Sequence, residues 1–332
     1  MATLGNSFVD LIDVYKLQDG NGQFVPVIEM LMEMTPILDD AIAVECNKGT
    51  THLHTVRAGL PAVTWGRLYK GVPNSKGATA QVEDTTGFVE GLSTVDKRLL
   101  ELSTNGGAVR LSEAQAYLES MAQEVGTKVF YGNSASDPEE FMGLAPRFND
   151  KSAANGGQIV DAGGTGSDNT SIWFVTWGDN QCNLLYPKGT QAGVQREDHG
   201  EQRVTDGDGN AYYAMEEKFT WHVGMAVKDW RYVSRIANID TTALAAGTVA
   251  LYDFMRKAYY KLQSRRVAGG KMAIYLNTDV LEALDALATN AGATDSFIRL
   301  KPMEIEGKEV MTYRGIPLRE TDSLINTEAR VV

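Results

Sequence analysis

The sequence predicts an α+β protein with an ordinary globular composition. Segments with apolar residues at helical spacing alternate along the chain with Thr- and Val-rich segments that are typical of strands. Hydrophobic residues make up 43% of the chain and charged residues 22%, as in soluble globular proteins. At 332 residues the chain is long enough for about one to three domains. No apolar run approaches the roughly 18 residues of a membrane span, so no membrane partner is expected.

The first 49 residues have the character of an arm. Residues 8–17 place Phe8, Leu11 and Tyr15 on one face of a predicted helix, which a Gly- and Asn-containing turn ends. A second apolar segment follows and is interrupted by two prolines. Short apolar pieces joined by helix breakers favour an arm that binds a partner. A self-contained helical subdomain at the N-terminus fits the same pattern nearly as well.

Residues 50–95 predict a long two-stranded hairpin. Both flanks are rich in Thr and Val, and the tip between them holds Gly, Pro, Asn and Ser. An isolated hairpin is marginally stable in water, so this one needs another surface to lie on. Its tip also carries residue types that are enriched in protein–protein contacts. These candidate contact residues are Trp65, Arg67, Leu68, Tyr69 and Lys70.

The clearest helix is predicted at residues 112–131. Ser112 followed by Gln115 has the form of a capping box, and an apolar stripe continues to Val129. Such a helix spans about 30 Å. The segment YGNSASDPEEFMGLAPR at residues 131–147 follows at once. It presents no reactive group, which indicates a structural corner.

The second half of the chain reads as strands and helices in a mixed order. The segment SIWFVTWG predicts a buried strand, and strict alternation of large apolar residues at 219–227 predicts a half-buried one. A helix is expected from Thr242 to Arg266 and another over TDVLEALDALAT. Three short strands follow.

Candidate catalytic and metal sites are weak. His52 and His54 share one strand face, but no further ligands stand at metal-binding spacing. Residues 206–217 mimic a calcium loop, yet its sixth position is Ala211 where glycine is required. A hairpin turn explains DGDGN better. No nucleophile, dinucleotide or phosphate-loop motif is present, so the sequence predicts neither an enzyme nor a cofactor.

Charge and cysteine content further narrow the kinds of protein that this sequence can encode. The chain carries 43 acidic and 31 basic side chains, a formal net charge of −12. Proteins that bind nucleic acid through its phosphates normally show a basic face. Sequence-specific DNA binding is therefore not expected. An acidic wall that only encloses DNA is compatible with this charge. Cys46 and Cys182 are far apart and lie in no CxxC pair, which predicts two free thiols.

Taken in order, the segments resemble the major capsid proteins of tailed bacteriophages, which share the Hong Kong 97-type shell fold. The succession of arm, long hairpin, long helix and YGN…PEEFMGL carries the resemblance. IYLNTDVLEALDAL is similar to a strand-helix unit of that fold, and YRGIPLRETDSL to the Gly-hydrophobic-Pro strand after it. VGMAVKDWRYVSRIANID resembles a segment found near the C-terminus of such proteins, but here it precedes LNTDVLEAL. This departure indicates a rearranged strand connectivity.

The resemblance implies a division of the chain into four parts. They are an N-terminal arm (1–49), an extended loop (50–95), a peripheral domain (96–150) with its spine helix, and an axial domain with returning peripheral strands (151–332). It implies a structural protein that assembles into hexamers and pentamers of an icosahedral virion head around double-stranded DNA, built in the host cytoplasm. It further implies a separate scaffolding protein, a portal and a decoration protein as partners.

Two other classes stay open at the level of the sequence. An encapsulin-type nanocompartment shell protein resembles the same fold but encloses enzymes. An unrelated soluble enzyme or binding module is the third alternative.

Overall fold

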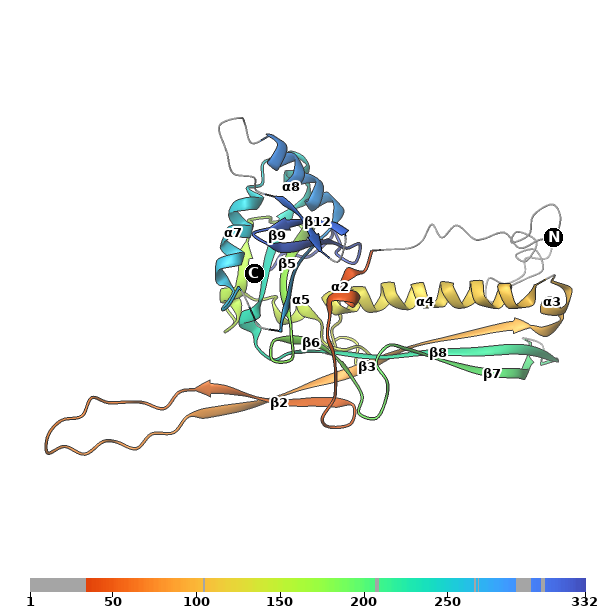
Figure 1. Cartoon of the computed structure of the whole chain (residues 1–332), viewed down its shortest axis with the longest axis horizontal. Helices are drawn as coiled ribbons and strands as arrows, with labels where there is room; N and C mark the ends of the chain where they lie inside the picture. The colour runs from red at the N-terminus through yellow and green to blue at the C-terminus, as the bar shows by residue number, and fades with distance from the viewer. Residues whose placement is uncertain are drawn as a thin grey trace.

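The structure, a computed structural model, describes residues 34–332 except 104, 207–208, 266, 268, 291–299 and 306–307. The predicted N-terminal helix with Phe8, Leu11 and Tyr15 therefore lies outside the described residues. A body with helices on its flank continues into a long helix that runs beside a ribbon of strands, and a hairpin projects the opposite way (Figure 1).

The helices of the described residues differ in length, and α4 is much the longest. Their bounds are α2 (Pro36–Asp40), α3 (Lys97–Leu102), α4 (Gly106–Tyr131), α5 (Leu144–Arg147), α6 (Thr241–Ala245), α7 (Leu251–Lys261) and α8 (Thr278–Asn290). Two 3₁₀ turns are η1 (Gly156–Gln158) and η2 (Trp230–Tyr232).

The strands of the described residues form one hydrogen-bonded network with the path β11-β12-β13-β10-β5-β6-β8-β3-β2. The first strands are β1 (Ala43–Glu45), β2 (Thr51–Gly59), β3 (Ala78–Asp96), β4 (Ile159–Asp161), β5 (Asn169–Trp177), β6 (Cys182–Tyr186) and β7 (Val194–Thr205). The others are β8 (Ala211–Val227), β9 (Val233–Asp240), β10 (Lys271–Leu276), β11 (Lys301–Ile305), β12 (Lys308–Tyr313) and β13 (Ile316–Glu320).

Strand β5 divides the body into two cores. All of its residues are buried, and successive side chains point to opposite faces. Trp173 and Val175 join the core that contains the end of α4. Ile172 and Phe174 join the core beneath α6, α7 and α8. The body is therefore a sheet covered on both faces, which confirms the buried strand predicted from SIWFVTWG.

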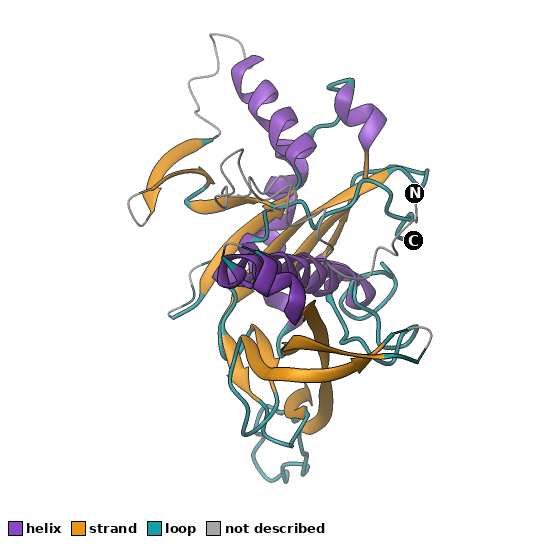
Figure 2. Ribbon diagram, turned by 90° about the vertical axis from the view of Figure 1, so that its right-hand side faces the viewer, coloured by secondary structure: helices purple, strands orange, loops and turns teal. Residues whose placement is uncertain are grey.

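Helix α4 is longer than predicted. It begins at Gly106 and not at Ser112, because the Asn105 side chain accepts a hydrogen bond from the Ala108 amide and caps the helix there. The predicted capping box therefore lies inside the helix. Its 26 residues span about 39 Å. Seen along its axis, α4 lies over the strands of the ribbon (Figure 2).

The helix predicted from Thr242 to Arg266 is broken in two. Helix α6 ends at Ala245, and Gly247 then adopts φ +68°, a conformation that ends helices. Helix α7 starts only at Leu251 and ends at Lys261. The prediction of one continuous helix was wrong because the apolar pattern passes through a turn that a glycine makes.

The ribbon beside α4 consists of β3, β8 and β7. Residues 86–96 of β3 pair with β8, and β7 pairs with the other edge of β8. The predicted turn at DGDGN connects β7 to β8, with the Asp206 carboxylate accepting from the Asn210 amide at 2.7 Å. This confirms a hairpin turn at the position of the calcium-loop mimic.

Candidate assembly interfaces

The tip of the first hairpin is the most exposed apolar part of the described chain. Strands β2 and β3 pair from Thr51 to Gly59, and residues 60–77 then project beyond the body (Figure 1). The predicted contact residues Trp65, Arg67, Leu68, Tyr69 and Lys70 all lie together in this exposed tip.

Among the described residues, nothing covers the large apolar side chains in the tip. Trp65 is 99% exposed and Leu68 90%. Sequence reasoning missed Leu60, Val63 and Val72, which are also exposed there. Single exposed apolar residues are ordinary, but a contiguous group of them marks an interaction surface.

The base of this hairpin is firmly anchored. The buried Asp84 carboxylate of β3 accepts a hydrogen bond from the Arg147 guanidinium of α5 at 2.8 Å. Arg147 also donates to the main-chain carbonyls of Met142 and Met225, each at 3.1 Å. One arginine thus ties the hairpin to the corner after α4 and to β8. The hairpin is held at its root and free at its tip.

Two histidines lie beside this anchor. The Nδ1 atom of His54 is 3.6 Å from a carboxylate oxygen of Asp84, and the His52 ring is 6.4 Å from the His54 ring. Burial lowers the pKa of both imidazoles, and nearby Lys228 lowers both further. Both shifts favour the neutral form of the rings, and the Asp84 charge partly opposes them.

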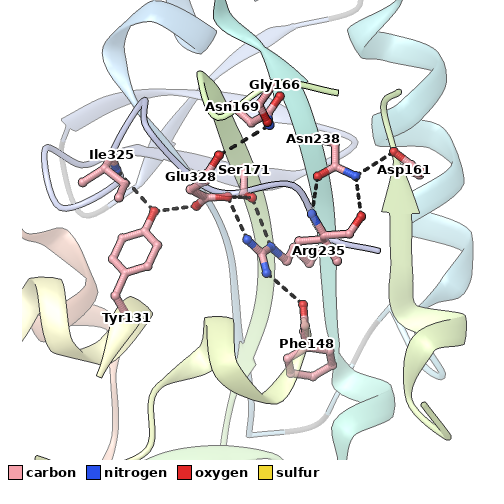
Figure 3. Close-up of polar contacts among 11 residues, drawn as sticks. Tyr131, Phe148, Asp161, Gly166, Asn169, Ser171, Arg235, Asn238, Ile325 and Glu328 are labelled. Atoms are coloured by element: carbon pink, nitrogen blue, oxygen red, sulfur yellow. Dashed lines mark hydrogen bonds and ion pairs between the residues drawn. The ribbon is translucent and has the colours of Figure 1, made fainter. Parts of the chain in front are cut away.

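A buried polar network joins α4, the sheet and the C-terminal segment (Figure 3). The Arg235 guanidinium of β9 contacts the Glu328 carboxylate at 2.7 Å and the Phe148 carbonyl at 2.8 Å. The Tyr131 hydroxyl, at the end of α4, donates to Glu328 at 2.5 Å. Ser171 of β5 contacts the same carboxylate. Burial, with the Glu328 charge, raises the pKa of Tyr131 far above its usual range, so this phenol stays protonated.

The same segment is held again near its end. The Asn238 side chain, also in β9, donates to the Val331 carbonyl at 2.9 Å and accepts from the Val331 amide at 2.7 Å. Asn238 has φ +60°, a region that asparagine tolerates better than most residues. The C-terminal segment therefore closes the junction between the long helix and the body.

No arrangement suited to catalysis occurs in the part of the chain that the structure describes. Its His, Cys, Asp and Glu residues form no group of three or more that could hold a metal ion. Cys46 and Cys182 are buried free thiols. Burial raises the pKa of both, that of Cys182 to about 12, which makes them poor nucleophiles. None of the described helices has the length and apolar character that crossing a membrane requires.

The comparisons with known proteins agree with this geometry. Residues 19–332 match the family model of major capsid protein GP7. A chain of the solved structure of bacteriophage Epsilon15 is 38% identical, with a TM-score of 0.79, and the match covers 100% of this chain and 99% of that one. A comparison with curated protein sequences returned no match.

More distant structures are also similar. A chain from the capsid of a native GTA particle is 11% identical over 68% of this chain and 97% of its own, with a TM-score of 0.46. The SrpI encapsulin of Synechococcus elongatus is 11% identical over 70% and 96%, with a TM-score of 0.46. Both likenesses are too distant to carry a conclusion about function.

The chain thus has the Hong Kong 97-type capsid fold and is a structural component of the phage virion, not an enzyme. It belongs to the family of the phage major capsid protein GP7.

Proposed function

We propose that this chain forms hexamers and pentamers of an icosahedral head that encloses double-stranded DNA, and that its hairpin lies across a neighbouring subunit. The observation that carries the proposal is the exposed apolar tip on an anchored base. Asp84 and Arg147 hold the root in place, while Trp65 and Leu68 contact nothing that would keep water from them.

The energetics favour a partner for the tip. Ordering each residue of a loop costs about 1–2 kcal/mol in backbone entropy, and residues 60–77 bury almost nothing within their own subunit. Burying one large apolar side chain contributes about 1.5–3 kcal/mol. A neighbouring subunit that covers Trp65, Leu68 and Tyr69 supplies this missing stabilisation. Trp, Tyr and Arg are also the residues that most often dominate interface energies.

The division into four parts is proposed on the same basis. Residues 1–49 form the arm, 50–95 the extended loop, 96–150 the peripheral domain and 151–332 the axial domain with the strands that return to the ribbon. The pairing of β3 with β8 supports this reading, because it joins the second strand of the loop to a strand from the last part. Phe8, Leu11 and Tyr15 of the arm are proposed as further contacts between subunits.

Partners other than the chain itself are also proposed. A shell closed entirely by one protein leaves no opening for DNA, which argues for a separate portal. A separate scaffolding protein that sets the curvature of the shell during assembly is proposed as a second partner. A decoration protein is a further candidate partner on the assembled shell.

The test is to replace residues 66–77 by a short Gly-Ser turn. Because these residues contact little of their own subunit, the variant should stay folded, with an unchanged circular dichroism spectrum and thermal midpoint. It should fail to form closed shells, or form shells that melt at a lower temperature, when assembly is followed by electron microscopy and light scattering.

Point variants sharpen this test. Trp65→Ala and Leu68→Ala should weaken assembly without changing subunit stability, whereas shortening the turn between β7 and β8 serves as the control. Shells of normal size and thermal stability from the 66–77 variant would refute the inter-subunit role of the hairpin.

A further inference from the structure

A second exposed surface combines two arginines with two tyrosines at the end of α7. The Arg265 guanidinium carbon is 4.7 Å from the Tyr260 ring centroid and 5.5 Å from that of Tyr259. The Arg314 guanidinium carbon is 5.3 and 5.1 Å from the same two centroids. Both arginines are within the range of cation–π attraction. We name these four residues the Arg–Tyr surface.

Arg314 occupies a backbone position that does not suit it. It has φ +53° and Gly315 has φ +81°, in a two-residue turn between Tyr313 and Ile316, which pair across β12 and β13. Such turns favour Asn-Gly, and a residue with a long side chain at positive φ costs about 1–2 kcal/mol. A strained residue that persists points to a role for its side chain.

Within the part of the chain that the structure describes, no carboxylate neutralises the charges on this surface. Neither Arg265 nor Arg314 has a carboxylate within 4.0 Å among the described residues, although both are exposed. Arg256 on the same helix, by contrast, pairs with Asp253 at 2.9 Å. Arg314 instead donates to the Tyr260 hydroxyl at 3.2 Å. The tyrosines fix two guanidinium groups in place without cancelling their charge.

A groove of complementary character lies between α6 and α8. It has a volume of about 660 Å³ and is lined by apolar side chains that include Leu244, Val249 and Leu287. Asp279 and Glu282 of α8 add negative charge to its wall. Asp279 accepts a hydrogen bond from Asn326, whereas the exposed Glu282 has no ion-pair partner among the described residues.

The groove and the Arg–Tyr surface lie at opposite ends of α7. Leu251, the first residue of α7, lines the groove, and Tyr260 stands in its last turn. At 1.5 Å per residue, their Cα atoms are separated by about 13 Å along the helix axis. One subunit cannot bring the two surfaces together, but a head-to-tail contact between two copies can. Contacts of this heterologous kind form rings when the rotation between neighbouring copies closes, and open filaments when it does not.

We propose that the Arg–Tyr surface of one copy docks against the α6–α8 groove of a second copy, with Arg265 and Arg314 facing Glu282. This inference rests on the proposed assembly into hexamers and pentamers and names a contact within those rings. The occupant is a second copy because its groove carries Glu282, whose charge matches the two arginines. Copies that each carry a net charge of −12 repel one another unless local charges match in this way. Tyr and Arg are also typical anchors of protein interfaces.

Nucleic acid fits this surface less well. Two free guanidinium groups neutralise few phosphates, and the arginines already lie over the tyrosine rings on which bases would stack. Binding of DNA is therefore the alternative outcome of the test.

The test is a charge exchange across the contact in the full chain. The pair Arg265→Glu and Arg314→Glu should raise the protein concentration needed for ring and shell formation by about tenfold or more, and Glu282→Arg should also raise it. The chain that combines all three changes should reverse at least half of this rise in the required concentration. Assembly is measured by light scattering and electron microscopy. Absence of recovery in the combined chain would overturn the proposal.

Two controls separate assembly from folding. Arg314→Asn suits the turn, so the thermal midpoint of the subunit should hold or rise while assembly weakens. Arg256→Gln, which removes a charge already paired within its helix, should leave assembly unchanged. Normal shells with reduced DNA content from the arginine variants would assign the surface to nucleic acid and overturn the contact between copies. These variants leave the hairpin intact, so they fail or succeed independently of the 66–77 replacement.

Discussion

Arg235 and Glu328 form a buried ion pair that joins β9 to the C-terminal segment. Their side chains are 2.7 Å apart and only 4% and 3% exposed, respectively. Glu328 is also contacted by Tyr131 from α4 and Ser171 from β5. These partners come from α4 and β5, so the ion pair links the long helix and the sheet to the C-terminal segment.

Removal of one partner of this pair should lower the free energy of unfolding strongly. Glu328→Ala leaves the Arg235 charge buried without a counter-charge, and breaking such a pair costs about 3–5 kcal/mol. We expect this loss in the free energy of unfolding measured with urea. Glu201→Ala, which breaks the surface pair with Lys97, is the matched control and should change stability little. A loss for Glu328→Ala as small as that of the control would contradict the role of the network.

The corner after α4 depends on a glycine. A Cβ atom on Gly132 would stand 2.6 Å from the carbonyl oxygens of both Lys128 and Phe141, and neither main-chain atom can move easily. We expect Gly132→Ala to destabilise the subunit by about 1–3 kcal/mol, seen as a lower thermal midpoint. Gly157→Ala is the control, because a Cβ atom there meets nothing within 4 Å. Equal midpoints for the two variants would show that the corner is not tightly packed.

Local pattern predicted much of this architecture. The apolar segment SIWFVTWG predicted β5, alternation predicted the 219–227 part of β8, and the apolar stripe predicted most of α4. The predicted ends of helices were wrong where a single residue sets the boundary. Asn105 moves the start of α4, and Gly247 divides the helix predicted at Thr242–Arg266. Asn105 acts through a local hydrogen bond and Gly247 through its backbone conformation. Hydrophobic periodicity contains no information about either effect.

The contacts between distant residues could not be predicted. Composition predicted a hairpin tip that contains Trp65 and Tyr69, and both side chains are exposed there. Their role in contacts between subunits stays a prediction. Arg235 and Glu328 are 93 positions apart, and no local signal pairs them. The same holds for Arg265 and Arg314, which meet only because the β12–β13 turn lies beside the end of α7.

Stability should fall as the pH drops below about 6.5 because of His54. Burial lowers its pKa in the folded state, Asp84 partly opposes this, and Lys228 and Arg147 lower it further. Near the ordinary histidine pKa of about 6.5 the unfolded chain therefore binds more protons than the folded one. Folding stability is lost from that pH down to the lowered folded pKa. His52 responds in the same direction.

The measurement is the urea midpoint as a function of pH. His54→Gln should flatten the decline between pH 7 and pH 5, while His199→Gln, at an exposed position of β7, should leave it unchanged. A decline of the same slope in the His54 variant would exclude this imidazole as the source.

DNA affinity should be weak, independent of base sequence and only slightly sensitive to salt. With 43 acidic and 31 basic side chains, the subunit can neutralise few phosphates, and each one contributes about −0.9 to the slope of log K against log salt. We expect a slope no steeper than about −3, measured by fluorescence anisotropy with two duplexes of unrelated sequence. If the Arg–Tyr surface contacts a second copy, Arg314→Asn should leave this slope unchanged. Tight retention of one duplex over the other at physiological salt would contradict the prediction, because an acidic wall that encloses DNA has no means of reading its bases.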